Sequence, residues 1–280
     1  MADDITPLAS LSLTHVYYDP SDPISYLCAF LALVPQALCV VYATLMWSTR
    51  EAEVILMFAG QMACEAFNFA LKRLIKEERP PTLGVGKGYG MPSSHAQFAV
   101  FWAVALGLFL VVRHKPRSTS RVVLGGNARS GPGTGAGANV GMPGESTAGR
   151  TTRFRGGGLG QIQLRDVEAY AHQPWSLIER VAVSAVALVL ASMVAGSRIY
   201  LGYHTPKQVL AGCLAGFVCA IGWFAVTYLL RQTGFLAQAL NWPVVRWFRI
   251  RDLVIEEDMC QAGWEKWEEK RLAAEQLKKN

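Results

Sequence analysis

The stretch that decides the fold runs from Met91 to Val112 and reads MPSSHAQFAVFWAVALGLFLVV. It begins with a proline, two serines and a histidine, and the run that follows, Ala96 to Val112, is almost entirely apolar. Such a run approaches the ~20 residues that an α-helix needs to cross the hydrocarbon core of a bilayer. The stretch therefore predicts a transmembrane helix that carries a polar cluster at its first turn.

Four further stretches have a similar length and composition. The chain is 51% hydrophobic and only 17% charged, which is typical of a membrane protein. We therefore predict an all-α integral membrane protein, a bundle of about five transmembrane helices with its motifs at helix ends on one membrane face. The other four predicted spans are Ile24 to Trp47, Val54 to Leu71, Leu177 to Gly196 and Val209 to Leu230.

Two of these spans need comment. Gln61, Glu65 and Asn68 interrupt the second span, and polar side chains at that depth must face other helices or water. We expect Glu65 to be either protonated or paired with a nearby base. No basic residue precedes Arg50, and the first apolar stretch is too long for the core of a signal peptide. We therefore expect it to remain as an anchor.

The remaining segments differ in composition from the spans. Residues 1–23 form a short N-terminal segment, 24–112 hold three spans and 176–230 hold two. Residues 113–175 contain 13 of the 26 glycines, which predicts a disordered cytosolic loop. Residues 231–280 read as a cytosolic tail with an amphipathic helix around Trp264 and Trp267. The six cysteines form no CxxC pair and read as buried thiols.

The distribution of basic residues predicts the orientation in the membrane. With five spans, 20 of the 27 Lys and Arg residues lie on the side that holds Arg50, the Gly-rich loop and the tail. Basic residues are retained on the cytoplasmic side, so residues 72–95 and 197–208 should face the lumen or the exterior. Topology also explains the net charge of +6 better than nucleic-acid binding does. We expect a bilayer and a lipid as partners, and no nucleic acid; the sequence identifies no protein partner.

Three polar patches fall on that charge-poor side. Lys72 and Arg79 follow the second span at a separation of about two helical turns, Pro92 to His95 open the third span, and Arg198 and His204 follow the fourth. Lys and Arg side chains and free N–H groups at a helix start bind phosphate oxygens. One histidine can attack phosphorus while the other protonates the leaving oxygen. No metal or other cofactor is needed for this chemistry, because the cations neutralise the phosphoryl charge.

These three patches resemble the signature of the type 2 phosphatidic acid phosphatase superfamily. The matching segments are K-x6-RP from Lys72 to Pro80, PSSH from Pro92 to His95 and SR-x5-H from Ser197 to His204. The motifs occur in the expected order, and the resemblance covers roughly residues 24–230. The resemblance implies that His204 forms a phosphohistidine intermediate and that His95 is the general acid. It implies that phosphate is bound by Lys72, Arg79, Ser93, Ser94 and Arg198.

One residue differs from the usual superfamily pattern and points to a particular branch of the superfamily. The superfamily usually has Asp four residues after the nucleophilic histidine, where this chain has Gln208. An amide oxygen still accepts the histidine Nδ1–H bond but contributes no charge. With Gln208, GYGMPSSH and SRIYLGYHT look like the dolichyl-diphosphatase branch, which removes one phosphate from dolichyl diphosphate in the endoplasmic reticulum. Together with the charge distribution, this implies an active site that faces the lumen. The extra phosphate of a diphosphate could be met by Arg73, Lys76 and Lys87.

Other functions fit parts of this pattern. Phosphatidate or a sphingoid-base phosphate is an alternative substrate, against which Gln208 is the main feature. A non-catalytic lipid-phosphate binder or a transporter would need the cations but not both histidines. Tyr200 and Tyr203 are expected in an interfacial aromatic belt, with the entrance of a lipid path as the alternative.

Overall fold

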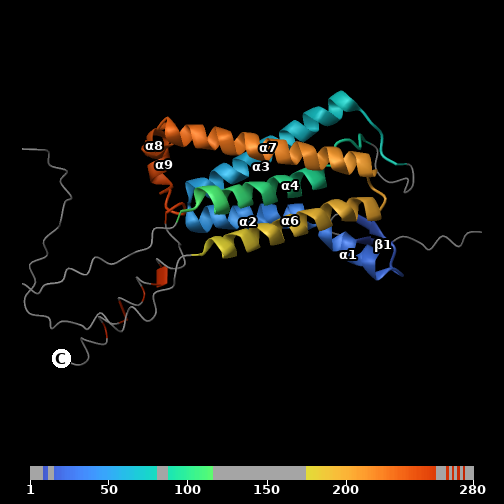
Figure 1. The fold of residues 1–280 in the computed structure, drawn as a ribbon, viewed down its shortest axis with the longest axis horizontal. Coiled ribbons are helices and arrows are strands. Elements are labelled where there is room, and N and C mark those ends of the chain that lie inside the picture. Colours follow the sequence, from blue (N-terminus) through green and yellow to red (C-terminus); the bar gives the residue numbers. More distant parts are fainter. Residues whose placement is uncertain are drawn as a thin grey trace, which may run out of the picture. The chain divides into compact units, whose positions relative to one another are not determined.

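The computed structural model describes residues 9–11, 16–80, 88–115 and 175–256, together with 263, 264, 267, 270, 271 and 274. The predicted loop 113–175 lies outside the described residues except at its edges, as does most of the predicted helix in the tail. Lys87 also lies outside them. The folded part that contains the described residues is a bundle of long helices (Figure 1).

Within the described residues, five segments are long and apolar enough to cross a membrane, which confirms the predicted number of spans. The first consists of α1 (Pro23–Leu31) and α2 (Val34–Thr49), and the second is α3 (Ala52–Ile75). The third consists of α4 (Ser94–Leu108) and the π-helical turn η2 (Phe109–Arg113). The last two are α6 (Leu177–Tyr200) and α7 (Pro206–Gln232).

The first span is not one continuous helix, as the sequence had suggested, but breaks at Ala32 and Leu33. Pro35 explains the break, because a proline has no N–H to donate and its ring clashes with the carbonyl four residues earlier. Pro35 instead lies in the first turn of α2, where a missing N–H costs nothing. The break leaves the carbonyl of Ala32 available to another partner.

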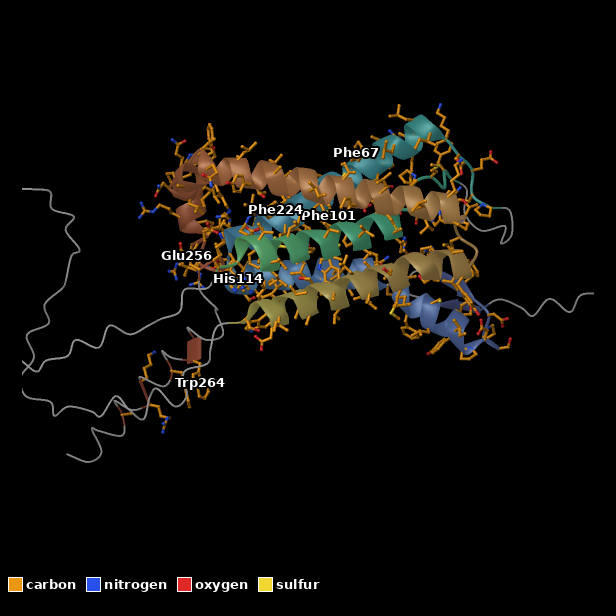
Figure 2. The ribbon with its side chains drawn as sticks, viewed as in Figure 1. Phe67, Phe101, His114, Phe224, Glu256 and Trp264 are labelled. Atoms are coloured by element: carbon orange, nitrogen blue, oxygen red, sulfur yellow. The ribbon has the colours of Figure 1, made fainter. Side chains whose placement is uncertain are left out.

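Helix α4 is the centre of the bundle. Half of its span is buried, against a third or less for each of the other four. Small residues allow the close packing: Ala99 and Ala103 meet Ala187 and Ala191 of α6. Figure 2 shows Phe101 of α4 at mid-bundle, where it is fully buried, whereas Phe67 of α3 lies at the edge and is 47% exposed. A central α4 fixes the position of the serines and histidine at its first turn.

The polar residues of α3 face α4, as the sequence predicted. Asn68 donates to Gln97 Oε1 at 2.5 Å, and Gln97 donates to the Cys64 carbonyl at 2.8 Å. Gln61 donates to the Phe98 carbonyl at 3.3 Å. A hydrogen bond inside the bilayer has no water to compete with it, so these contacts fix the register of α3 against α4.

A buried ion-pair network holds the opposite end of the bundle. Glu53 is 2% exposed and accepts from Arg113 at 2.5 Å and from Arg231 at 2.6 Å. Arg231 also pairs with Asp252, so that α3, η2, α7 and the chain beyond α7 are joined. Figure 2 shows His114, which follows η2, at this same end. The start of the predicted tail is therefore folded onto the bundle, through α8 (Phe235–Leu240), α9 (Pro243–Trp247) and residues 249–256.

A small sheet adds to the predicted all-helical fold. Strands β1 (Ala9–Leu11) and β2 (Val16–Tyr18) pair antiparallel near α1. The backbone N–H of Tyr17 donates to the Tyr203 hydroxyl at 2.8 Å. Val16 packs with residues of α1 and with Leu201 and Tyr203 between α6 and α7. The N-terminal segment thus covers the turn that carries His204.

Candidate active site

Four helix ends bring the three predicted motifs to one end of the bundle (Figure 1). Lys72 lies in the last turn of α3, Ser94 begins α4, Arg198 lies in the last turn of α6, and His204 precedes the N-cap of α7. The chain runs in alternating directions through these helices, so segments far apart in sequence meet. The ion-pair network around Glu53 lies at the other end.

Direct contacts join the motifs to each other. Lys72 Nζ donates to Ser94 Oγ at 3.3 Å, which links the first motif to the second. The Ser93 backbone N–H donates to the Gln208 carbonyl at 3.1 Å, which links the second to the third. A Cβ atom added to Gly212 of α7 would lie 2.5 Å from the Ser93 carbonyl oxygen. Glycine at this position therefore lets α7 approach the first turn of α4.

Several buried polar atoms at this end have no hydrogen-bond partner among the described residues. They come from all three motifs: Arg79 Nε, Ser93 Oγ, and Nε and Nη1 of Arg198. Ser93 is fully buried and Arg198 is 4% exposed. Buried polar groups in native proteins are almost always paired, since an unpaired one costs ~1–3 kcal/mol. A cluster of unpaired donors is the arrangement expected of a site that binds an anion.

The Arg198 guanidinium is held in place by an aromatic ring. Its central carbon lies 4.3 Å from the centroid of Tyr203, the distance of a cation–π contact. Tyr203 is 7% exposed and accepts a hydrogen bond from Tyr17, so it is not a member of an interfacial belt. The belt prediction was wrong for Tyr203, because the turn after α6 folds inward over Arg198. Tyr200 is 52% exposed and donates to Asp22.

The His204 side chain is positioned by Gln208. Its Nδ1 atom lies 3.2 Å from Gln208 Oε1, and both residues are buried. Gln208 also forms a capping box with Thr205, the N-cap of α7, with Pro206 in the first turn. Because Oε1 can only accept, this contact places the proton on Nδ1 and leaves Nε2 with its lone pair.

The surroundings of His204 favour the neutral ring. The pKa of His204 is lowered to about 4, mainly by burial and next by the positive charge of Arg198. The Gln208 hydrogen bond opposes these effects, and the charges of Arg79 and Lys72 make smaller contributions in the same direction as Arg198. His204 is therefore a neutral imidazole at pH 7, near the cations of the first and third motifs.

The other histidine stands beside a groove. The His95 ring hydrogen-bonds to the Ala32 backbone, at the carbonyl that the break between α1 and α2 leaves available. A groove of about 260 Å³ begins at Ser94 and His95 and continues between α2, α3 and α4. Apolar side chains form much of its wall, and Glu65 lies in it with its Oε1 unpaired among the described residues. Its lining residues are Pro35, Gln36, Cys39, Met62, Glu65, Ser94, His95 and Phe98.

The remaining predicted cations lie differently. Arg73 is exposed and stacks on Phe69 of its own helix at 4.1 Å, and Lys76 is exposed at the C-cap of α3. The structure therefore does not bring these two predicted cations together with the unpaired donors. Lys207, a further cation at this end of the bundle, pairs with Glu77 at 2.9 Å.

Sequence reasoning missed Glu77, the inward-facing Tyr203 and the path of the groove. Glu77 had a signal that was overlooked, since a carboxylate stands inside the basic segment KRLIKEERP. Tyr203 and the groove had none, because they depend on how the turn after α6 and the helices pack.

Comparison with known proteins places the chain in a family. The model of the PAP2 superfamily matches residues 51–232. A Neurospora crassa protein named "Putative dolichyldiphosphatase" is 61% identical over 99% of this chain and 98% of its own length. The Homo sapiens protein named Dolichyldiphosphatase 1 is 31% identical over 86% of this chain and 81% of its own. The Dictyostelium discoideum protein of the same name is 27% identical, over 91% and 87%. No solved structure matches.

The three motifs, the five spans and these relatives agree: the chain belongs to the PAP2 superfamily and, within it, to the group of proteins named dolichyldiphosphatase.

Proposed function

We propose that this membrane enzyme hydrolyses dolichyl diphosphate to dolichyl phosphate and inorganic phosphate. The observation that carries the proposal is the set of unpaired buried donors of Arg79, Ser93 and Arg198 next to neutral His204. A phosphoryl group has three non-bridging oxygens that accept such bonds, and an Arg fork matches two of them. A binder alone would need the donors but not an unprotonated, oriented imidazole among them.

In the first half-reaction, His204 Nε2 attacks the terminal phosphorus. The bond from phosphorus to the bridging oxygen breaks as the bond from nitrogen to phosphorus forms, and dolichyl phosphate leaves. Arg79, Arg198, Lys72 and the Ser93 and Ser94 hydroxyls bind the phosphoryl oxygens and stabilise the charge of the transition state. Gln208 accepts the Nδ1–H bond and holds the ring in line for attack.

His95 acts on the oxygen that leaves and on the water that enters. One ring N–H donates to the Ala32 carbonyl, so the second nitrogen carries a proton only in the imidazolium form, which the negative charge of a bound diphosphate favours. That imidazolium gives its second proton to the leaving oxygen and becomes neutral. In the second half-reaction it takes a proton from water, whose oxygen attacks phosphorus as the bond from phosphorus to nitrogen breaks. Inorganic phosphate leaves and His204 is neutral again. The cations supply the charge stabilisation, so the mechanism calls for no metal ion.

The groove between α2, α3 and α4 supports a lipid substrate. It leads from Ser94 and His95 along apolar side chains such as Met62 and Phe98. An isoprenoid chain could lie there while its diphosphate reaches the donors. Gln208 and the names of the relatives favour dolichyl diphosphate over phosphatidate or a sphingoid-base phosphate.

We place this activity in the endoplasmic reticulum membrane, with the active site facing the lumen. The end of the bundle away from the site carries the ion-pair network around Glu53, and the described residues that follow Gln232 there include Arg246, Arg249 and Arg251. Basic segments favour the cytosol. On the lumenal side the enzyme would regenerate the lipid carrier used in protein N-glycosylation.

The proposal is tested by phosphate release from dolichyl diphosphate, dolichyl phosphate, phosphatidate and a sphingoid phosphate, each with and without excess EDTA. We expect the highest kcat/KM for dolichyl diphosphate and no change with EDTA. A preference for phosphatidate would overturn the substrate assignment. Activity that EDTA abolishes and Mg²⁺ restores would overturn the metal-free mechanism.

A further inference from the structure

Glu77 is joined to the nucleophile through a single amide group. Gln208 Oε1 faces His204, and on the other side Gln208 Nε2 donates to Glu77 Oε1 at 3.1 Å and to the Glu78 backbone carbonyl at 2.8 Å. The second carboxylate oxygen of Glu77 accepts from Lys207 at 2.9 Å. The chain of contacts therefore runs from a carboxylate, through an amide, to the imidazole.

These contacts determine which way the Gln208 amide points. In the observed orientation its oxygen meets two donors, His204 Nδ1–H and the Thr205 backbone N–H, the latter at 3.3 Å. Its NH₂ group meets two acceptors, from Glu77 and Glu78. A flipped amide would place oxygen against oxygen and N–H against N–H. Glu77 thus disfavours the flip, and it does so more strongly as a carboxylate than a neutral acceptor would.

The surrounding backbone holds Glu77 in this position. Its carbonyl accepts from the Gly90 N–H at 2.7 Å. A Cβ atom added to Gly90 would lie 2.8 Å from Gln208 Oε1 and 2.9 Å from Nε2, so only glycine leaves room for the amide. The Glu77 pKa is lowered by its hydrogen bonds to Lys207 and Gln208, and the carboxylate is therefore ionised at neutral pH.

We propose that Glu77 is a positioning residue for His204: its carboxylate orients and polarises the Gln208 amide, and the amide in turn holds the Nδ1–H tautomer and stabilises the positive charge that the ring gains on phosphorylation. Hydrogen bonds in a chain polarise one another, so a charge one amide away still acts on the imidazole. The proposal rests on the proposed function of His204. In other enzymes a carboxylate hydrogen-bonds directly to the catalytic histidine and orients it. Here Glu77 would have the same role through the Gln208 amide.

The test compares Glu77→Met with Glu78→Met. Both variants remove one carboxylate from the same segment, but the Glu78 side chain is exposed and only its backbone carbonyl binds Gln208. We expect Glu77→Met to lower kcat about 10- to 100-fold, by analogy with the loss of a hydrogen-bond partner that orients a metal-binding histidine, with KM changed less than 3-fold. Glu78→Met should keep kcat within about 2-fold. Glu77→Gln, which still offers an oxygen, should fall in between.

A double exchange separates positioning from a merely structural role. Gln208→Glu alone places two carboxylates against each other and should lower kcat. Combined with Glu77→Gln, the amide and the carboxylate change places, so the contact between residues 77 and 208 again joins a donor to an acceptor. The Glu78 carbonyl still loses its donor, so kcat should rise above the level of Gln208→Glu alone without reaching the wild-type value. Equal losses of kcat in Glu77→Met and Glu78→Met, or no recovery in the double exchange, would overturn the proposal. The kcat and KM values are measured on whichever panel substrate the wild type hydrolyses. A wild type that hydrolyses none of the substrates contradicts the proposed function and not the role of Glu77.

Discussion

Replacing Arg198 by methionine should remove activity without lowering stability. The side chain is 4% exposed, and its Nε and Nη1 atoms have no partner in the described part of the chain. Two unpaired donors at ~1–3 kcal/mol each cost ~2–6 kcal/mol, and methionine removes them. The lost contact with Tyr203 is worth ~0.5–2 kcal/mol, so the net change lies between zero and ~5 kcal/mol in favour of the variant.

The same substitution should be severe for catalysis. Two charge-assisted hydrogen bonds to phosphoryl oxygens are worth ~3–6 kcal/mol, which corresponds to a ~10²- to 10⁴-fold loss of kcat/KM. The assays are phosphate release and thermal unfolding of the purified protein in detergent, with and without vanadate. Vanadate resembles the pentacoordinate transition state, so it should raise the Tm of the wild type but not that of Arg198→Met.

A matched control comes from the other end of the bundle. Arg231 is also largely buried, but it is paired with Glu53 and Asp252. Arg231→Met leaves Asp252 without its ion-pair partner and Glu53 with Arg113 alone, and it should lower the Tm, at a cost of up to ~3–5 kcal/mol. An equal fall in Tm for Arg198→Met and Arg231→Met would refute the account of Arg198, because it would show that the guanidinium stabilises the fold.

Two further predictions concern packing and protonation. Gly212→Ala should lower both Tm and activity, since the new methyl group overlaps the Ser93 carbonyl at a cost of ~1–3 kcal/mol, whereas Gly222→Ala, with open space around it, should change neither. Equal effects at the two glycines would contradict the close approach of α7 to α4. The acid limb of kcat/KM that reports His204 should lie near pH 4, because the folded protein favours the neutral ring. An acid limb at pH 6.5, after correction for substrate ionisation, would contradict the burial argument. The same shift affects stability: because the pKa of His204 in the folded protein lies below the usual 6.5, its contribution to stability is lost as the pH falls from about 6.5 to 4.

The spans and motifs could be predicted because each leaves a local pattern. A long run of apolar residues indicates a transmembrane helix whatever its neighbours are, and such runs end near Lys72, Ser94, Arg198 and His204. Because successive spans cross the membrane in opposite directions, these ends lie on the same side and the motifs meet. The contact between His204 and Gln208 also follows from local spacing, since residues four apart meet at a helix start.

The rest depends on contacts that no local pattern carries. The inward turn of Tyr203 results from packing against Arg198 and the N-terminal strand. The partner of Glu77 is 131 residues away in the chain, so no spacing could indicate it. The break at Ala32 could have been predicted from Pro35. The contact between the Ala32 carbonyl and His95 could not, because it depends on how α1 and α4 pack.

The most direct test of the central claim is to trap the phosphoryl group on its nucleophile. Wild-type enzyme and His95→Ala are mixed with dolichyl diphosphate labelled on the terminal phosphate, quenched in alkali within one turnover, and mapped by peptide mass spectrometry. We predict a label that is stable to alkali and labile to acid, located on His204, more abundant in His95→Ala, and absent from His204→Ala. A label on another residue, or turnover by His204→Ala near the wild-type rate, would contradict the mechanism.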